Sequence, residues 1–205
     1  MYRNKIAAKY INIVDRNGNG AVHKLLNDKW SGKFVYKRAQ LLSDYIKFGF
    51  EFDRPNYKGN TPLHLSACGF FEKSDLDCTN ILINNRAQID AINYKGYTPL
   101  FNAVNTGTLE IIKKLVENGA NINHVDLRGN SLLHHTGKCI NSILFFSMKP
   151  AIKNNIFIMP NDYESNSEKI PNDAIEAIMV WNYLVESGCE IRKNNIGQLP
   201  IDSYF

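Results

Sequence analysis

Apolar residues recur at helical spacing along residues 109–120, which read LEIIKKLVENGA. Leu109, Ile112, Leu115 and Val116 lie three and four residues apart, so a helix would carry them on one face. Gly119 follows, and glycine is the usual residue for the left-handed turn that ends a helix. This pattern predicts a helix with one buried face and a defined end.

The same pattern occurs three more times. Residues 39–49 and 175–188 end in Gly49 and Gly188, whereas residues 79–87 carry Arg86 where the glycine is expected. A positive φ is uncommon and costly for a residue with a side chain. We therefore expect Arg86 either to adopt a positive φ at some cost or to alter the turn.

Helix starts are marked by short boxes that precede some of these stretches. The chain reads TPLH from Thr61 to His64 and TPLF from Thr98 to Phe101. Threonine serves as a helix N-cap, and proline is tolerated in the first turn because its missing N–H would have no partner there. Each box therefore predicts the start of a short first helix, whose threonine accepts a hydrogen bond from the helix backbone.

The boxes and helices repeat along the chain. Residues 93–125 form one complete unit of 33 residues, and weaker copies read GAVH near the N-terminus and LPID near the C-terminus. The candidate turn glycines are spaced by 41, 37, 33 and 68 residues, so the units differ by insertions. These glycines are Gly18, Gly59, Gly96, Gly129 and Gly197.

The TPLH box and the 33-residue period resemble the ankyrin-repeat family. The resemblance implies an all-α fold, a solenoid of about five stacked helix-turn-helix units with short hairpin turns, in which the first and last units are degenerate caps. We expect residues 1–205 to form a single ankyrin-repeat domain. Its units are about 12–53, 56–92, 93–125, 126–193 with an insertion at about 137–173, and a partial cap at 194–205.

The segment from 137 to 173 fits the repeat poorly. It contains no turn box and no terminal glycine, which favours an insertion into the fourth unit. The spacing of 68 residues is nevertheless close to twice 34, so a degenerate extra repeat is the alternative.

Composition and charge exclude several classes of function. The 24 basic side chains are interleaved with 20 acidic ones, for a net charge of +4, which demands neither nucleic acid nor a membrane. The four cysteines, Cys68, Cys78, Cys139 and Cys189, form no CxxC pair, so we expect the cytoplasm or another reducing compartment. The amino-acid usage is typical of an AT-rich genome such as that of a virus, an intracellular bacterium or a protist. Specialised secretion into a host cell therefore stays open.

Candidate catalytic and metal-binding residues compete with structural roles. The resemblance implies a structural imidazole at the fourth box position, which His23, His64 and His134 occupy. His135 and Cys139 share a helical face but lack any further nucleophile signature. Carboxylates such as Asp75 are expected to be structural or solvated, and no glycine-rich phosphate loop occurs. We expect no enzyme, no metal and no cofactor.

The resemblance implies a non-catalytic scaffold, expected to be monomeric, that binds an unidentified protein. The box and stripe residues are committed to packing, so the hairpin tips and concave face are left for recognition, and Tyr and Arg are favoured interface anchors. One alternative is an enzyme with a site in segment 135–173. Another is a substrate for asparagine hydroxylation at Asn123, with Asn121 where an acidic residue is usual. The candidate binding residues are Tyr57, Lys58, Asn60, Tyr94, Lys95, Tyr97, Leu127, Arg128 and Asn130.

Overall fold

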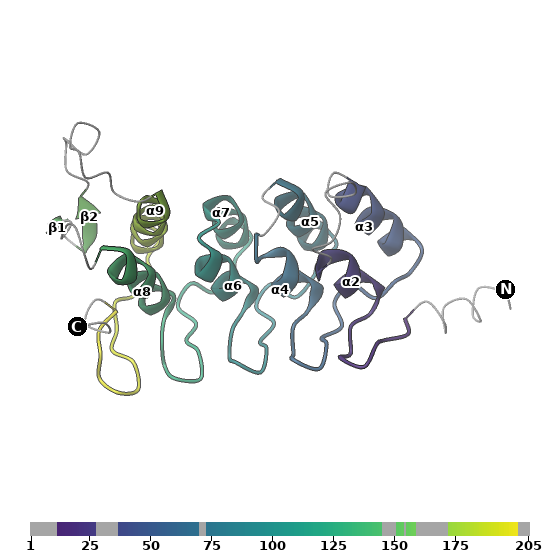
Figure 1. Ribbon diagram of the computed structural model, residues 1–205, viewed down its shortest axis with the longest axis horizontal. Coiled ribbons are helices and arrows are strands. Elements are labelled where there is room, and N and C mark those ends of the chain that lie inside the picture. Colours follow the sequence, from purple (N-terminus) through teal and green to yellow (C-terminus); the bar gives the residue numbers. More distant parts are fainter. Residues whose placement is uncertain are drawn as a thin grey trace, which may run out of the picture. The chain divides into compact units, whose positions relative to one another are not determined.

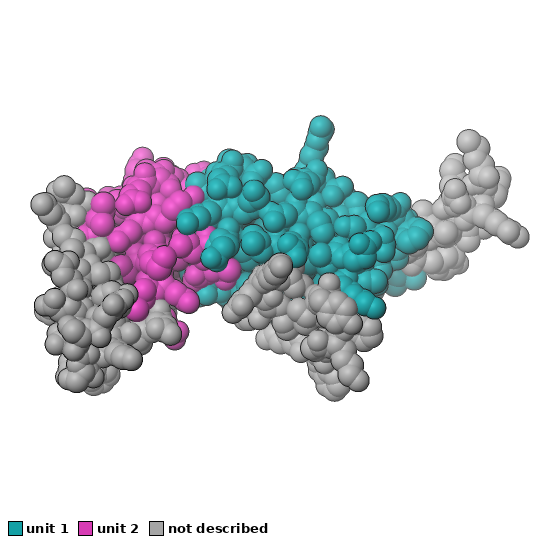
Figure 2. Space-filling view, turned by 90° about the horizontal axis from the view of Figure 1, so that it is seen from above, with its two compact units in different colours: residues 1–106, 110–120 teal, residues 107–109, 121–205 magenta. Residues whose placement is uncertain are grey.

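The computed structural model describes residues 12–27, 37–69, 73–144, 151–153, 155–158 and 172–200. Two compact units divide the chain (Figure 2). The first comprises Met1–Thr106 with Glu110–Ala120, and the second comprises Gly107–Leu109 with Asn121–Phe205. The single domain expected over the whole chain stays a prediction, and each unit is described by itself.

The described residues of the first unit form three helix pairs. In Figure 1 the first helices α2, α4 and α6 form one row, and the second helices α3, α5 and α7 form another. Helix α4 packs against both α2 and α6, and α3 packs against α5, so each pair is buried by its neighbours. The bounds are Ala21–Asn27 for α2, Arg38–Lys47 for α3, Pro62–Ser66 for α4, Lys73–Asn84 for α5, Pro99–Thr106 for α6 and Leu109–Glu117 for α7.

The core of this unit follows the predicted apolar stripes with one difference. In α7 the buried residues are Ile111, Ile112 and Leu115, whereas Leu109 and Val116 are half-buried. Ile111 thus completes the buried face, because the helix packs across a wider stripe than the predicted one. Arg86 has a φ of 64°, so it adopts the left-handed turn itself.

In the second unit the part of the chain that the structure describes forms one helix pair and one short hairpin. Helix α8 (Leu132–Leu144) packs against α9 (Asn172–Glu186), and α9 also packs against strand β2. Strands β1 (Ala151–Lys153) and β2 (Ile156–Ile158) are antiparallel, with Ile152 opposite Phe157. The indole of the fully buried Trp181 donates a hydrogen bond to the Asn155 carbonyl at 2.8 Å.

Helices α8 and α9 extend into the segment 137–173, which fits the repeat poorly. Residues 137–144 continue α8 and residues 172–173 begin α9, so both ends of the insertion expected at 137–173 are helical. The regular structure of the described residues is helical apart from the hairpin. The all-α solenoid class is therefore correct, with a two-stranded hairpin that the repeat pattern did not predict.

The predicted capping role is confirmed at one box and wrong at the other. Thr61 and His64 form a reciprocal capping box at the start of α4. The imidazole Nδ1 accepts from the backbone N–H of Thr61 at 3.1 Å and lies 2.9 Å from its hydroxyl. At the start of α6, Phe101 replaces the histidine, and the buried Thr98 hydroxyl has no hydrogen-bond partner among the described residues.

A buried ion pair connects the first two repeats. Arg38 of α3 lies 3.0 Å from the carboxylate of Asp75 in α5, and both side chains are almost fully buried. The guanidinium also donates to the Leu25 carbonyl at 3.1 Å and to the Leu26 carbonyl, so it caps the end of α2. Of the two roles expected for Asp75, structural or solvated, the buried pair with Arg38 supports the structural one.

Replacing Arg38 should destabilise the protein strongly, since it would leave the Asp75 carboxylate buried without its counter-charge. We expect Arg38→Ala to lower the free energy of unfolding by about 3–5 kcal/mol. Arg54→Ala removes an exposed pair with Glu51 and should cost less than about 1 kcal/mol. Urea denaturation of both variants measures the difference, and equal losses would contradict the role given to Arg38.

The two box threonines should respond oppositely to the same substitution. Thr98→Val removes a buried hydroxyl that has no partner, so stability should be unchanged or raised. Thr61→Val removes the hydroxyl that contacts His64 and should lower the free energy of unfolding by about 0.5–2 kcal/mol. Thermal unfolding of the pair tests this, and a larger loss for Thr98→Val would refute it.

Candidate protein-binding site

The described residues include five repeat tips, at residues 15–19, 56–60, 93–97, 126–130 and 194–198, and each is held by one side chain at its first position. The Asn56 carboxamide oxygen accepts hydrogen bonds from the backbone N–H groups of Lys58 and Asn60, at 2.9 and 3.0 Å. Such local bonds fix a turn without help from the rest of the fold. The same pair of bonds forms at Asp15, Asn93, Asp126 and Asn194. This recurrent Asn or Asp stands three residues before each turn glycine, a signal in the sequence that could have predicted its role.

Neighbouring tips of the first unit are joined to one another. The Tyr57 N–H donates to the Asn17 carbonyl at 3.0 Å, and the Tyr94 N–H donates to the Lys58 carbonyl at 3.1 Å. Gly59 lies at this second junction with a φ of 76°, and a Cβ there would come within 2.9 Å of Asn93 Cα. Glycine is required at this position because both the conformation and the close approach exclude a side chain.

The side-chain amides form a second ladder along the same tips. The Asn56 amide nitrogen donates to the Asn19 side-chain oxygen, and the Asn93 amide nitrogen donates to the Asn60 side-chain oxygen, both at 2.8 Å. Two independent sets of bonds therefore fix the register of the second tip against the third. Tyr57 and Lys58 of the second tip are therefore held at the same positions as Tyr94 and Lys95 of the third tip.

In α2, α4 and α8 the box histidine ties the first helix to the next tip. His64 Nε2 donates to the Tyr97 carbonyl at 3.0 Å. The assignment follows from the partners, because the Thr61 N–H can only donate to Nδ1 and a carbonyl can only accept. His23 and His134 bond in the same way to the carbonyls of Asn60 and Gln198. The structural role that the resemblance implied for these imidazoles is confirmed.

Six of the nine candidate residues line one hollow of about 510 Å³ in the first unit. It lies between the second and third tips and extends to the first helix α6. None of its lining residues is acidic and two are lysines, so the hollow is positively charged. The lining residues are Tyr57, Lys58, Asn60, Asn93, Tyr94, Lys95, Tyr97, Asn102 and Asn105.

The three tyrosines of the hollow differ in what they contact. Tyr57 and Tyr94 occupy the same position of successive tips and are 64% and 74% exposed. Tyr97 is half-buried, and its ring stacks on the fully buried Phe101 with centroids 5.3 Å apart. Lys95 Nζ lies 5.9 Å from the centroid of the Tyr97 ring. Tyr94 is therefore available for recognition, whereas Tyr97 also supports the core.

The remaining three candidates belong to the second unit. Leu127 is 72% exposed at the tip that Asp126 holds. The Arg128 carbonyl accepts from the Asn195 N–H at 3.2 Å, and the Asn130 side-chain oxygen accepts from Asn194 at 3.0 Å. The structure thus groups these residues with the fifth tip.

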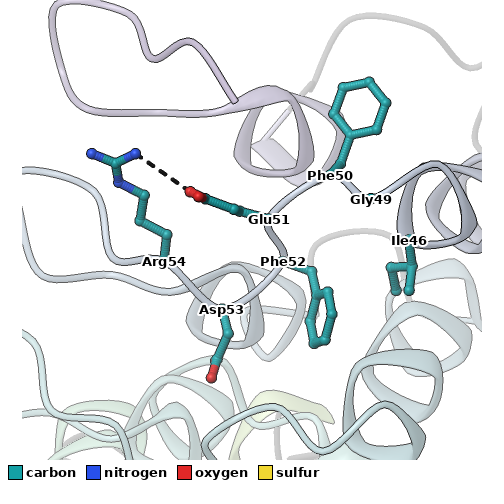
Figure 3. Close-up of a pocket in the computed structure, with 7 residues that line it drawn as sticks. All are labelled: Ile46, Gly49, Phe50, Glu51, Phe52, Asp53 and Arg54. Atoms are coloured by element: carbon teal, nitrogen blue, oxygen red, sulfur yellow. Dashed lines mark hydrogen bonds and ion pairs between the residues drawn. The ribbon is translucent and has the colours of Figure 1, made fainter. Parts of the chain in front are cut away.

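A second hollow, of about 570 Å³, lies beside the end of α3 (Figure 3). Its rim carries the ion pair of Arg54 with Glu51, at 3.3 Å. Burial raises the pKa of Asp53, against a hydrogen bond from the Gln88 N–H at 3.1 Å. The hollow offers two carboxylates and a guanidinium but no nucleophile or histidine. Its lining residues are Ile46, Gly49, Phe50, Glu51, Phe52, Asp53 and Arg54.

The alternative of an enzyme site in segment 135–173 depends on His135 and Cys139, and the structure describes the side chain of His135. His135 Nε2 lies 3.2 Å from the carboxylate of Asp126, which holds the fourth tip. Burial acts to raise the pKa of Asp126, but hydrogen bonds from Asn130, Arg128 and His135 outweigh it and lower the pKa. The Cys139 side chain and residues 159–171 lie outside the described part. Within that part, no three His, Cys, Asp or Glu side chains are grouped to hold a metal ion.

The candidate for hydroxylation is also engaged. The Asn123 side-chain oxygen accepts from the Glu190 N–H at 2.8 Å, and the Asn123 N–H donates to the Asn121 side chain at 2.9 Å. A modifying enzyme would have to break the bond to Glu190 to reach this amide.

No helix of the described residues is both long and apolar enough to cross a bilayer.

Helix pairs that begin at a recurrent box and alternate with protruding hairpins define a repeat protein whose units bury one another. The chain belongs to the ankyrin-repeat family, because the family model for ankyrin repeats in three copies matches residues 7–126. An ankyrin repeat protein of Acanthamoeba polyphaga mimivirus is 31% identical over 65% of this chain. The B-cell lymphoma 3 protein homolog of Mus musculus is 29% identical over 59%, and an ankyrin repeat protein of variola virus is 27% identical over 56%. The matches cover 17%, 25% and 20% of those relatives.

The protein should lose stability when the pH falls from about 7.5 to 5. Burial lowers the pKa of His23 and His64, so the unfolded chain binds protons more readily than the folded one. Their contribution is fully present above the unfolded pKa of about 6.5 and is lost as the pH falls below it. Urea denaturation across this range measures the loss.

The variant His64→Gln provides the control. Its stability at neutral pH should be lower, but its dependence on pH should be weaker than that of the natural chain. A free energy of unfolding that stays constant or rises between pH 7.5 and 5 would contradict the role given to the box histidines.

Proposed function

We propose that the protein is a non-catalytic scaffold that binds another protein through the tips and first helix of its second and third repeats. One observation carries the proposal: six residues selected from the sequence as candidates line the same hollow. Ankyrin repeats generally mediate protein–protein interaction, which is the coarser statement that the family membership supports. The residues of this surface, rather than the fold, determine which partner binds.

The exposed aromatic rings support this site over the rest of the unit. Tyrosine contributes large contact area with little conformational entropy to lose, which is why it is enriched at interface centres. Tyr57 and Tyr94 are held in register by tips that are already bonded to one another. A partner would therefore meet a preorganised surface, which reduces the entropic cost of binding.

The proposal extends to the state of the protein. We expect a monomer in the cytoplasm or another reducing compartment, with a host protein as partner if the chain comes from a virus or an intracellular bacterium. Burial raises the pKa of the Cys189 thiol to about 11, and this thiol donates to the Ile122 carbonyl at 3.3 Å. A thiol held in this way is used for packing and has little thiolate character at neutral pH.

Photo-crosslinking tests the site before the partner has been identified. A photoreactive phenylalanine analogue at position 94 should crosslink a specific protein in cells of the source organism. The same analogue at Phe48, which is 72% exposed on the α3 side of this unit, is the matched control. Equal crosslinking from both positions, or none from position 94, would refute the proposed surface.

The identified partner then allows a quantitative test. Tyr94→Ala should weaken its binding at least about tenfold, the loss typical of a central aromatic anchor, and leave the melting temperature nearly unchanged. Leu115→Ala should do the reverse, because it opens a cavity in the core worth about 2–5 kcal/mol of stability. Binding that survives Tyr94→Ala unchanged would contradict the proposal.

A further inference from the structure

The binding hollow carries a regular arrangement of positive charge. The second and third tips share the sequence NYKG, so Tyr57 and Lys58 recur as Tyr94 and Lys95. Both lysines are exposed, and no acidic residue lines the hollow between them. The first tip adds Arg16, also exposed, which stands at the position that Tyr57 and Tyr94 occupy in the next two tips and beside the carboxylate of Asp15. A row of single cations therefore runs along the tips of the first unit.

The spacing of this row is set by the stacking of the repeats. Packed helices are separated by about 8–10 Å, and tips joined by backbone hydrogen bonds follow the same step. An extended peptide in the polyproline II conformation advances by about 3.1 Å per residue, so three residues cover about 9 Å. Because the polyproline II conformation has three residues per turn, side chains three residues apart point to the same side and would meet successive tips.

The floor of the hollow offers polar groups that suit an extended backbone. The Asn60 side-chain oxygen is occupied by Asn93, which leaves the Asn60 NH2 group to donate. The Asn102 NH2 group donates to the His64 carbonyl at 2.9 Å, which leaves the Asn102 oxygen to accept. An extended segment presents both N–H and C=O groups, so one donor and one acceptor can bind its backbone.

We propose that this hollow binds an extended acidic segment of a partner protein, with carboxylates three residues apart that pair with Lys58 and Lys95. The intervening side chains contact the rings of Tyr57 and Tyr94. This inference rests on the proposed function and adds the chemistry of the partner. A nucleic acid is disfavoured because each tip contributes a single cation, whereas nucleic-acid grooves neutralise many phosphates at once.

Fluorescence anisotropy with short capped peptides tests the charge spacing. One peptide has two glutamates three residues apart, a second has the same composition with the glutamates adjacent, and a third has glutamine in their place. The first should bind at least about threefold more tightly than the second, and the third more weakly than both. Raising the salt concentration from 50 to 300 mM should weaken binding of the first peptide.

Two lysine variants and one matched control assign the charge to the hollow. Lys58→Gln and Lys95→Gln should each weaken binding of the first peptide by about twofold to fivefold. Lys47→Gln, at an exposed lysine that ends α3, removes the same charge from the same unit outside the hollow and should leave binding unchanged. Circular dichroism should show that all three variants keep the fold.

Several outcomes would overturn the inference. These are no binding of the first peptide at millimolar concentration, equal binding of the first two peptides, or equal effects of the three lysine variants. Tighter binding of a single-stranded oligonucleotide, lost in Lys58→Gln and Lys95→Gln, would make the hollow a nucleic-acid site instead. A partner that crosslinks at position 94 but ignores both lysine variants would exclude the acidic segment and leave the proposed function standing.

Discussion

A single polar side chain at the start of each hairpin tip supports the rest of the binding surface. Asn56 and Asn93 use one oxygen to bind two backbone N–H groups, which closes the turn and leaves the next two side chains outside it. The amide nitrogens of the same residues reach the preceding tip. Turn closure therefore depends on one residue per tip, and at Asn56 and Asn93 the same residue adds a side-chain bond to the backbone bond that joins the tips.

Much of the fold could be predicted from the sequence because its signals are local. The TPLH box, the helix that ends near Gly119 and the substitution at Arg86 each act within a few residues, and the structure has a helix start or a left-handed turn at these places, although the buried face of α7 also includes Ile111. The buried pair of Arg38 with Asp75 could not be found this way, since its partners are 37 residues apart. The β1–β2 hairpin could not be predicted because residues 151–158 contain no turn box and no terminal glycine.

The site was predicted only in part, for a related reason. Position within the repeat identified Tyr57 and Tyr94 as residues that packing does not use, but it could not show that they line a hollow together with Asn102 and Asn105 of α6. The stacking of Tyr97 on Phe101 could not be predicted either, because it depends on Phe101 standing where other boxes have a histidine. The same replacement explains the unpartnered hydroxyl of Thr98.

The bonds between tips use backbone atoms of the residues whose side chains face outward. The Lys58 carbonyl accepts from the Tyr94 N–H whatever side chain residue 58 carries. The chemistry presented at these positions can therefore drift under mutation while the scaffold beneath it persists. Evolution can retarget such a surface one tip at a time, and a laboratory library that varies only residues 57, 58, 94 and 95 should yield folded proteins with new specificities.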